Sequence, residues 1–348
     1  MSDCDPCRCP LCGRDNACAM TRGATDATAC WCGPLTIPAT TLARVPDRAL
    51  GKACVCPACA GAFGDGVELA ADPGGRPQFV LTNADDRLTL AADGAQVLSW
   101  RHRSREILWQ ASAPEFAPGK PVRGGVPLVF PWFGDDPERR GRPAHGFARN
   151  RRWLLAPGQP ANGVSLCLGS QSADGDLWPH AFTTELEVRL TPNPELRWRV
   201  RNVGATTWSF EQALHTYFAV GDVTTAEVRG LEGVPHEEQA SEPERAWDPH
   251  APLRFVAETD RIFQGVPDRI ELVAPALDRR VELHTDGARS AIVWTPWPKK
   301  AARLAQLGSN DWRRFVCIET ANVGCNAVTL APGAAHELTL RLRVADLR

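Results

Sequence analysis

The chain has 348 residues, of which 43% are hydrophobic, and its 39 basic and 41 acidic side chains give a formal net charge of -2. This length is enough for about two domains. The near-neutral charge removes the usual electrostatic basis for binding nucleic acid. No run of about 18 apolar residues is present, and the first residues lack the basic and apolar segments of a signal peptide. We therefore expect a folded cytoplasmic protein that binds neither a membrane nor nucleic acid.

The cysteines divide the chain unevenly. Ten of the 13 lie between Cys4 and Cys59, and the remaining 289 residues contain three. Between these regions, residues 61–77 are rich in Gly, Ala, Asp and Pro. This change predicts a cysteine-rich domain at 1–60, a linker at 61–77 and a second domain at 78–348.

A unit of about 60 residues buries little apolar surface, so it needs additional stabilisation. In a reducing compartment, cysteines favour metal ligation over disulfides. The Cys-x-x-Cys pairs Cys9–Cys12 and Cys56–Cys59 offer four thiolates to one tetrahedral structural zinc. A second site can draw on Cys18, Cys30, Cys32 and Cys54. Metal-free or redox-active thiols and disulfides are the alternatives. The segments CPLCG, CWC and CVCPAC resemble the small cysteine-rich CWC family.

Alternating hydrophobicity recurs along the rest of the chain. Apolar residues alternate over 186–190 and again over 196–200, with the turn sequence TPNPE between them, which predicts a β-hairpin. The same pattern occurs at 88–90, 281–283 and 338–344, and only 299–307 has a helical pattern. Many strands without a βαβ rhythm predict an all-β fold, a large antiparallel sandwich.

Common catalytic motifs are absent from the sequence. It contains no G-x-S-x-G elbow, no G-x-x-x-x-G-K-[ST] loop, no H-E-x-x-H motif and no G-x-G-x-x-G fingerprint after a strand. The main support for a serine hydrolase, a P-loop NTPase, a zincin or a Rossmann dehydrogenase is therefore missing.

Several polar residues stand within apolar, aromatic segments. Arg123 precedes two glycines, which would let the backbone approach a ligand while the guanidinium binds an anion. His145 and Arg149 lie four residues apart in a glycine-containing loop and can face one pocket. The plainer alternatives are a loop histidine bonded within the protein and ordinary arginines, because 35 of the 39 basic residues are Arg.

Three further residues are candidates for proton transfer or binding. His215 lies among strand residues near the single tyrosine, Tyr217, and an imidazole can transfer protons near neutral pH. A core histidine bonded to the backbone is the alternative. Glu319 lies inside a strand that is predicted to be buried, where an unpaired carboxylate is costly. Asp260 lies in the segment ETDR, for which a surface ion pair is the alternative.

Taken together, these segments resemble the glucose-6-phosphate 1-epimerases, also called hexose-6-phosphate mutarotases, within the aldose 1-epimerase group. The resemblance spans about residues 79–344, and its motifs are RGGVPLVFPWFG, PAHGFARN, ALHTYF, ETDR, VWTPW and CIETAN. It implies a galactose-mutarotase-like β-supersandwich, with the site on the concave face of one sheet.

The resemblance also implies roles for individual side chains and a hexose 6-phosphate substrate. The matched residues are His215 as general acid, Glu319 as general base, Arg123 and Arg149 as 6-phosphate ligands, Asp260 as a contact of sugar hydroxyls and His145 as a further ligand. Some members have Gln where Ala144 stands, so any hydroxyl contact of that side chain is missing. Anomer interconversion by an acid and a base needs no catalytic metal or nucleotide.

Three other functions are compatible with parts of the sequence. A mutarotase for unphosphorylated aldoses is disfavoured by the two matched arginines, and a non-catalytic sugar-phosphate sensor by the retained His215 and Glu319. A zinc-dependent nucleic-acid-binding protein is disfavoured because residues 1–60 have six basic and five acidic side chains. A protein-docking role for the cysteine-rich domain is open, with its partner unknown.

Overall fold

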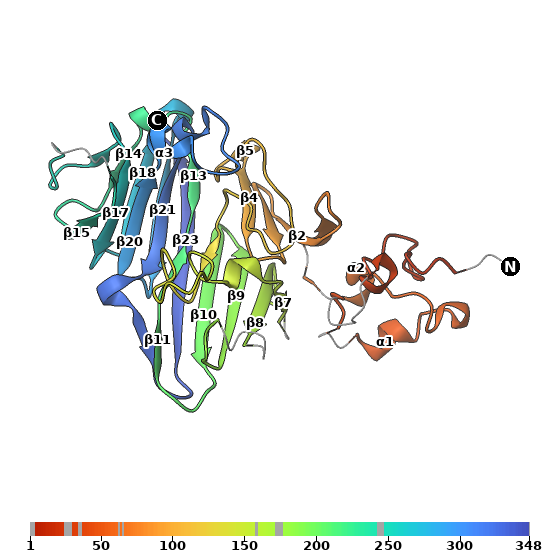
Figure 1. Ribbon diagram of the computed structural model, residues 1–348. Helices are drawn as coiled ribbons and strands as arrows, with labels where there is room; N and C mark the ends of the chain where they lie inside the picture. Colours follow the sequence, from red (N-terminus) through yellow and green to blue (C-terminus); the bar gives the residue numbers. More distant parts are fainter. Residues whose placement is uncertain are drawn as a thin grey trace.

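The computed structural model describes residues 4–23, 30–33, 37–61, 63–64, 66–156, 159–170, 177–241 and 247–347. Antiparallel strands dominate these residues, as the alternating hydrophobicity predicted, and they form two large sheets (Figure 1). The α-helices in the described segments have four or five residues each, and none is long and apolar enough to cross a membrane. They are α1 (Ala39–Leu42), α2 (Pro57–Ala60) and α3 (Trp297–Ala301).

The larger sheet has nine strands and includes the predicted hairpin. Its strands in spatial order are β16 (Leu253–Arg254), β14 (Glu227–Arg229), β18 (Arg269–Ala274), β19 (Arg279–Asp286), β23 (Ala335–Asp346), β10 (Pro194–Asn202), β9 (Phe182–Leu190), β8 (Gly163–Gly169) and β7 (Leu154–Leu155). Leu186 pairs with Trp198 in the β9–β10 hairpin, and both are fully buried. The hairpin prediction is confirmed, and its alternate residues point into the core between the sheets.

A seven-stranded sheet faces the larger one across this core. Its path is β15 (His236–Glu238), β17 (Thr259–Gln264), β20 (Ser290–Thr295), β21 (Phe315–Asn322), β12 (Gln212–Leu214) and β6 (Leu128–Val129), with β13 (Tyr217–Ala219) also paired to β21. Strands β11 (Trp208–Phe210) and β22 (Val328–Leu330) form a separate two-stranded sheet.

Strand β21 is buried on both faces, and this decides where its carboxylate lies. All eight of its residues are buried. Val316 and Ile318 belong to the main core, whereas Cys317 and Ala321 belong to two smaller apolar clusters. Because side chains alternate along a strand, Glu319 shares the face of Cys317 and Ala321, away from the main core.

A five-stranded sheet precedes these two, and its first strand lies inside the predicted linker. It consists of β1 (Val67–Ala71), β2 (Pro77–Thr82), β3 (Asp86–Ala91), β4 (Val97–His102) and β5 (Arg105–Glu106). Strand β1 falls inside the segment 61–77 that we predicted as a linker. It pairs with β2 through its backbone, and none of its side chains is fully buried, so its apolar pattern is short and weak. The helix predicted at 299–307 begins earlier and is shorter in the structure. It is α3, a single turn that ends at Ala301.

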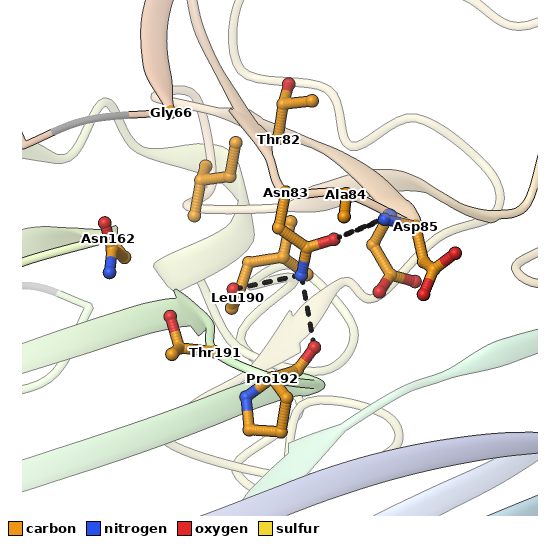
Figure 2. A pocket seen from close by; sticks show the side chains of 11 residues that line it. Gly66, Thr82, Asn83, Ala84, Asp85, Asn162, Leu190, Thr191 and Pro192 are labelled. Carbon is orange, nitrogen blue, oxygen red and sulfur yellow. Dashed lines mark hydrogen bonds between the residues drawn. The ribbon is translucent and has the colours of Figure 1, made fainter.

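The side chain of Asn83 links the five-stranded sheet to the turn of the β9–β10 hairpin by hydrogen bonds. The Asn83 amide donates to the carbonyls of Leu190 (3.2 Å) and Pro192 (3.1 Å). Its carbonyl oxygen accepts from the backbone N–H groups of Asp85 (3.0 Å) and Asp86 (2.8 Å), as Figure 2 shows in part. A cavity of about 450 Å³ surrounds this link, and its lining includes none of the six predicted site residues. Asn83 completes its bonding within the protein, so we assign the link a structural role.

The described part of the cysteine-rich region packs against the sheet domain near β2 and β7 (Figure 1). Trp31 and Cys56 belong to the same apolar core as Phe79 of β2. The ring of Phe63 lies edge-on to Phe79, with centroids 5.6 Å apart. The two regions therefore share one continuous core.

Candidate active site

An interruption between two short strands brings a histidine opposite the buried carboxylate. Strand β12 ends at Leu214 and β13 begins at Tyr217, and both pair with β21. In the gap, the backbone N–H of Ile318 donates to the carbonyl of Thr216 (3.1 Å), and that of His215 donates to Pro127 (3.0 Å). The His215 Nε2 atom consequently lies 3.3 Å from Glu319 Oε1.

The pair is withdrawn from solvent but is incompletely bonded. His215 is 7% exposed and Glu319 is 2% exposed. The Tyr217 ring stacks on the His215 ring, with centroids 4.9 Å apart and planes at 9°. Within the described protein, His215 Nδ1 and Glu319 Oε2 have no hydrogen-bond partner. Unpartnered buried polar atoms are costly, so these atoms are available to a ligand.

Burial moves both members of the pair toward their neutral forms. It raises the pKa of Glu319 well above the usual range, an effect that Asp260 reinforces and Arg149 opposes. Burial lowers the pKa of His215 well below its usual value, and the nearby His145 and Arg149 lower it further. Removal from water disfavours a charged carboxylate and a charged imidazole alike. Burial therefore favours the form of the pair in which both side chains are neutral.

His145 is fixed in a strained turn beside this pair. Its φ is 60°, and its ring centroid lies 5.7 Å from that of His215. The backbone N–H of Gly134 donates to His145 Nδ1 (3.3 Å). Burial, assisted by Arg149 and Arg123, lowers the pKa of His145 to about 3. A neutral ring that accepts at Nδ1 has its proton on Nε2, so His145 can donate a hydrogen bond from that atom.

Two arginines place positive charge at the same site. The Arg149 Nη2 group donates to the carbonyl of Ala144 (2.8 Å), while its buried Nε lacks a partner. The Nε of Arg123 donates to the carbonyl of Ala305 (2.8 Å). Among the residues that the structure describes, neither guanidinium forms an ion pair with a carboxylate. Both charges lower the pKa of His215 and of Tyr217, so both arginines lie within electrostatic reach of the pair.

The two glycines after Arg123 have a different role from the one we expected. A Cβ on Gly124 would lie 2.4 Å from Gln110 Cα, and one on Gly125 would lie 2.1 Å from the Val97 carbonyl oxygen. Both residues have positive φ angles. They therefore permit close packing of the protein's own backbone, and the expected approach to a ligand is not their evident role.

Asp260 lies on β17, on the opposite side of β21 from β12, and it takes part in an ion pair. Lys300, from α3, lies 3.2 Å from Asp260 Oδ2 and 2.9 Å from Glu258 Oε1. Burial raises the pKa of Asp260, and Lys300 opposes this effect. The ion-pair alternative for this segment therefore holds, but Asp260 is half-buried and its charge acts on Glu319.

The six predicted side chains therefore converge on one face of the seven-stranded sheet. The sequence did not identify Lys300, which orients the carboxylates of Glu258 and Asp260. A compositional signal was present, because the chain has only four lysines and two of them, Lys299 and Lys300, follow the segment VWTPW. The pairing itself joins segments 40 residues apart, so spacing along the chain did not reveal it.

Four cysteines of the N-terminal region form a second cluster. The Sγ atoms of Cys9, Cys12, Cys56 and Cys59 all lie within 4.8 Å of one another, so the cluster could hold a metal ion. Those of Cys12 and Cys56 are 3.6 Å apart. All four are free thiols. The predicted ligand set is thus brought together by the fold.

Comparison with known proteins finds family matches in both parts of the chain. The family model described as "Aldose 1-epimerase" matches residues 77–343, and that described as "Cysteine-rich CWC" matches residues 9–61. A protein of Cenchrus ciliaris named "Putative glucose-6-phosphate 1-epimerase" is 32% identical, over 77% of this chain and 84% of its own.

Solved structures show the same architecture. A crystal structure described as a "putative mutarotase" from Salmonella typhimurium has a TM-score of 0.70 at 25% identity, covering 80% of this chain and 97% of its own. A galactose mutarotase-like protein from Lactobacillus casei has a TM-score of 0.61 at 18% identity, covering 77% and 100%. The sheet domain therefore has the galactose-mutarotase-like β-supersandwich fold.

Proposed function

The chain belongs to the aldose 1-epimerase family, and from this we propose that it interconverts the α and β anomers of a hexose 6-phosphate, with glucose 6-phosphate as the first candidate. The contact between His215 Nε2 and Glu319 Oε1 is the observation on which the proposal rests. It joins a base and an acid at one buried place, with unpartnered atoms on both side chains.

The reaction follows from one proton shared by this pair. The Glu319 carboxylate takes the proton from the O1 hydroxyl, while protonated His215 gives its proton to the ring oxygen. The bond between C1 and the ring oxygen breaks, and C1 becomes an aldehyde. Rotation about C1–C2 presents the other face of the aldehyde. In ring closure Glu319 returns its proton to O1 and His215 takes the proton from the attacking hydroxyl, so the proton count is unchanged.

The electrostatic environment suits this cycle. Ring opening converts a charged pair into a neutral one, and burial favours the neutral pair, as the opposite pKa shifts of Glu319 and His215 show. The same burial makes the ionised carboxylate a stronger base and the protonated imidazole a stronger acid. We assign His145 the role of a neutral donor to the sugar and Asp260 that of an acceptor from its hydroxyls.

We assign Arg123 and Arg149 to the 6-phosphate. A phosphate dianion is bound well by forked guanidinium groups. Within the described protein, both guanidiniums are free of carboxylate partners, and the buried Nε of Arg149 lacks an acceptor. This uncompensated charge favours a phosphorylated sugar over a free aldose.

The test compares two substrates in purified protein by NMR exchange between anomers, above the spontaneous rate. Arg123→Met and Arg149→Met should each reduce kcat/KM for glucose 6-phosphate by about 10- to 100-fold, since a charge-assisted hydrogen bond contributes ~1.5–3 kcal/mol. The effect on glucose should be small. Arg280→Met, at an exposed arginine of β19, is the matched control and should change neither rate.

Other outcomes would overturn parts of the proposal. An equal loss with both sugars would mean that the arginines maintain structure and do not select the phosphate. Binding of glucose 6-phosphate without acceleration of its anomerisation by the unaltered protein would instead support the non-catalytic sensor.

For the cysteine-rich region we propose structural zinc at Cys9, Cys12, Cys56 and Cys59. Four convergent thiolates match the tetrahedral preference of that ion. The cluster lies outside the predicted catalytic residues, and metal binding to so small a unit would contribute to its folding. The sugar chemistry itself uses no metal in this scheme.

A further inference from the structure

The cysteine-rich region contains a second group of converging thiols. The Sγ atom of Cys18 lies 3.7 Å from that of Cys30 and 3.8 Å from that of Cys54. Cys32 completes the four, because it lies two residues after Cys30 in the segment CWC. These four residues are separate from the set Cys9, Cys12, Cys56 and Cys59.

Two of the sulfur–sulfur distances match those of a metal-centred tetrahedron. A Zn–S bond of about 2.3 Å places the sulfur atoms of a tetrahedral site about 3.8 Å apart. A disulfide would require about 2.05 Å. Cys18 therefore already has the spacing of a fellow ligand from both Cys30 and Cys54.

A backbone N–H group also points at one of these sulfur atoms. The N–H of Ala19 donates to Cys30 Sγ (3.3 Å). Such a donor stabilises negative charge on sulfur and orients the ligand of a thiolate site. It is an observation independent of the sulfur spacing.

We propose that Cys18, Cys30, Cys32 and Cys54 form a second tetrahedral metal–thiolate site, for which zinc is the fitting ion. The two sites are nested along the chain, because all four ligands of the second lie between Cys12 and Cys56. Cys54 and Cys56 belong to different sites although one residue separates them. A metal ion at each site would constrain both the two ends of this segment and the chain between them.

The second site also fixes the residue that joins the region to the sheet domain. Trp31 lies between the ligands Cys30 and Cys32, is 6% exposed and donates from Nε1 to the carbonyl of Asn16 (3.0 Å). It lines a small hollow together with Phe79 of β2 and Trp153. The metal thus holds the turn that presents Trp31 to the sheet domain.

The test is metal analysis of the full chain, purified under reducing conditions with zinc supplied and excess removed. The unaltered protein should contain two zinc ions per chain. Cys32→Ser should lose one or both ions, whereas Cys32→His, which keeps a zinc ligand, should retain two. Cys325→Ser is the control, because this exposed cysteine lies outside both clusters, and it should also retain two.

A second measurement connects the site with Trp31. Hydrogen exchange across residues 77–82 and 153–155 should quicken in Cys32→Ser and stay unchanged in Cys32→His. One zinc ion per chain in the unaltered protein, with the same content in both Cys32 variants, would overturn the proposal. An intact mass showing a disulfide among these four cysteines after reducing purification would overturn it as well. Sugar anomerisation is not a readout here, so failure of this proposal is distinct from failure of the proposed enzyme function.

Discussion

Glu319 is a carboxylate held on an apolar face of a central strand, and its environment determines what it can do. It is 2% exposed, one oxygen contacts His215, and the other lacks a partner within the described protein. A carboxylate that only stabilised the fold would be expected to have both oxygens bonded, because an unpaired one is costly. Its arrangement is that of a group whose remaining partner is a ligand.

We therefore expect Glu319→Gln and His215→Asn each to reduce anomerisation of glucose 6-phosphate by about 10²- to 10⁴-fold, the usual contribution of an acid–base group. Glutamine keeps the size of glutamate but cannot accept the O1 proton. NMR exchange rates measure the effect, and circular dichroism checks the fold. Glu337→Gln, at an exposed position of β23, should keep full activity. Near-normal turnover by Glu319→Gln would remove this residue from the mechanism.

The pH dependence should report a pair that works with one proton. Burial raises the pKa of Glu319 and lowers that of His215, so Glu319 holds the last proton as the pH rises. Activity falls on the alkaline side when this proton is lost, and on the acid side when His215 takes a second one. A plot of kcat/KM against pH should be bell-shaped, with limits that belong to the coupled pair.

Changing one neighbouring charge should move the alkaline limit in a known direction. The charge of Asp260 raises the pKa of Glu319, whereas that of Arg149 lowers it. In Asp260→Asn, Glu319 should release its proton more easily, so the alkaline limit should move to lower pH. Arg149→Gln should move it to higher pH. Movement of both variants in the same direction would contradict the assignment of this limit to Glu319.

At the scale of elements, a buried arginine of β19 is hydrogen-bonded to β13, the strand that follows His215. Arg279, the first residue of β19, is 1% exposed. Its Nη1 donates to the Glu106 carbonyl (2.6 Å) and its Nη2 to the Ala219 carbonyl (2.6 Å). Burial lowers the pKa of Arg279 to about 10, so the guanidinium stays charged at neutral pH. It joins β5 and β13, and β13 begins two residues after His215.

Arg279→Met should therefore destabilise the protein by about 1–3 kcal/mol, because two partly buried carbonyls lose their donor. Chemical denaturation measures the free energy of unfolding. The matched change Arg280→Met removes the exposed neighbour and should have little effect. Equal stability of the two variants would show that the carbonyls find other donors.

Some elements and site residues could be predicted from the sequence, and others could not. Glu319 and His215 were singled out as candidates because each is a polar residue within an apolar segment, although their roles came from the family resemblance. The β9–β10 hairpin was predicted because both strands alternate around a proline-containing turn. Strand β1 was not identified, because an edge strand pairs through its backbone and buries few side chains. Lys300 was not identified because its ion pairs with Glu258 and Asp260 join elements that only the folded chain brings together.

In the whole molecule, the cysteine-rich region and the sheet domain are less independent than their compositions indicated. The predicted linker 61–77 contains β1, which belongs to the five-stranded sheet. Trp31 packs in the core that includes Phe79, and Phe63 also contacts Phe79. The boundary at residue 60 stays a prediction, but a cut near it exposes apolar surface on the sheet domain.

Deletion of residues 1–62 tests this relation, because it keeps Phe63 and β1 while removing every cysteine of both clusters. All six proposed site residues lie after residue 120, so kcat/KM for glucose 6-phosphate should be unchanged. The melting temperature should fall, since Phe79 and Trp153 lose the cover of Trp31. Trp31→Ala in the full chain should lower the melting temperature in the same direction without changing kcat/KM. If the shortened protein keeps its strand content by circular dichroism but loses anomerase activity, the cysteine-rich region completes the active site, and the separation of roles proposed above is wrong.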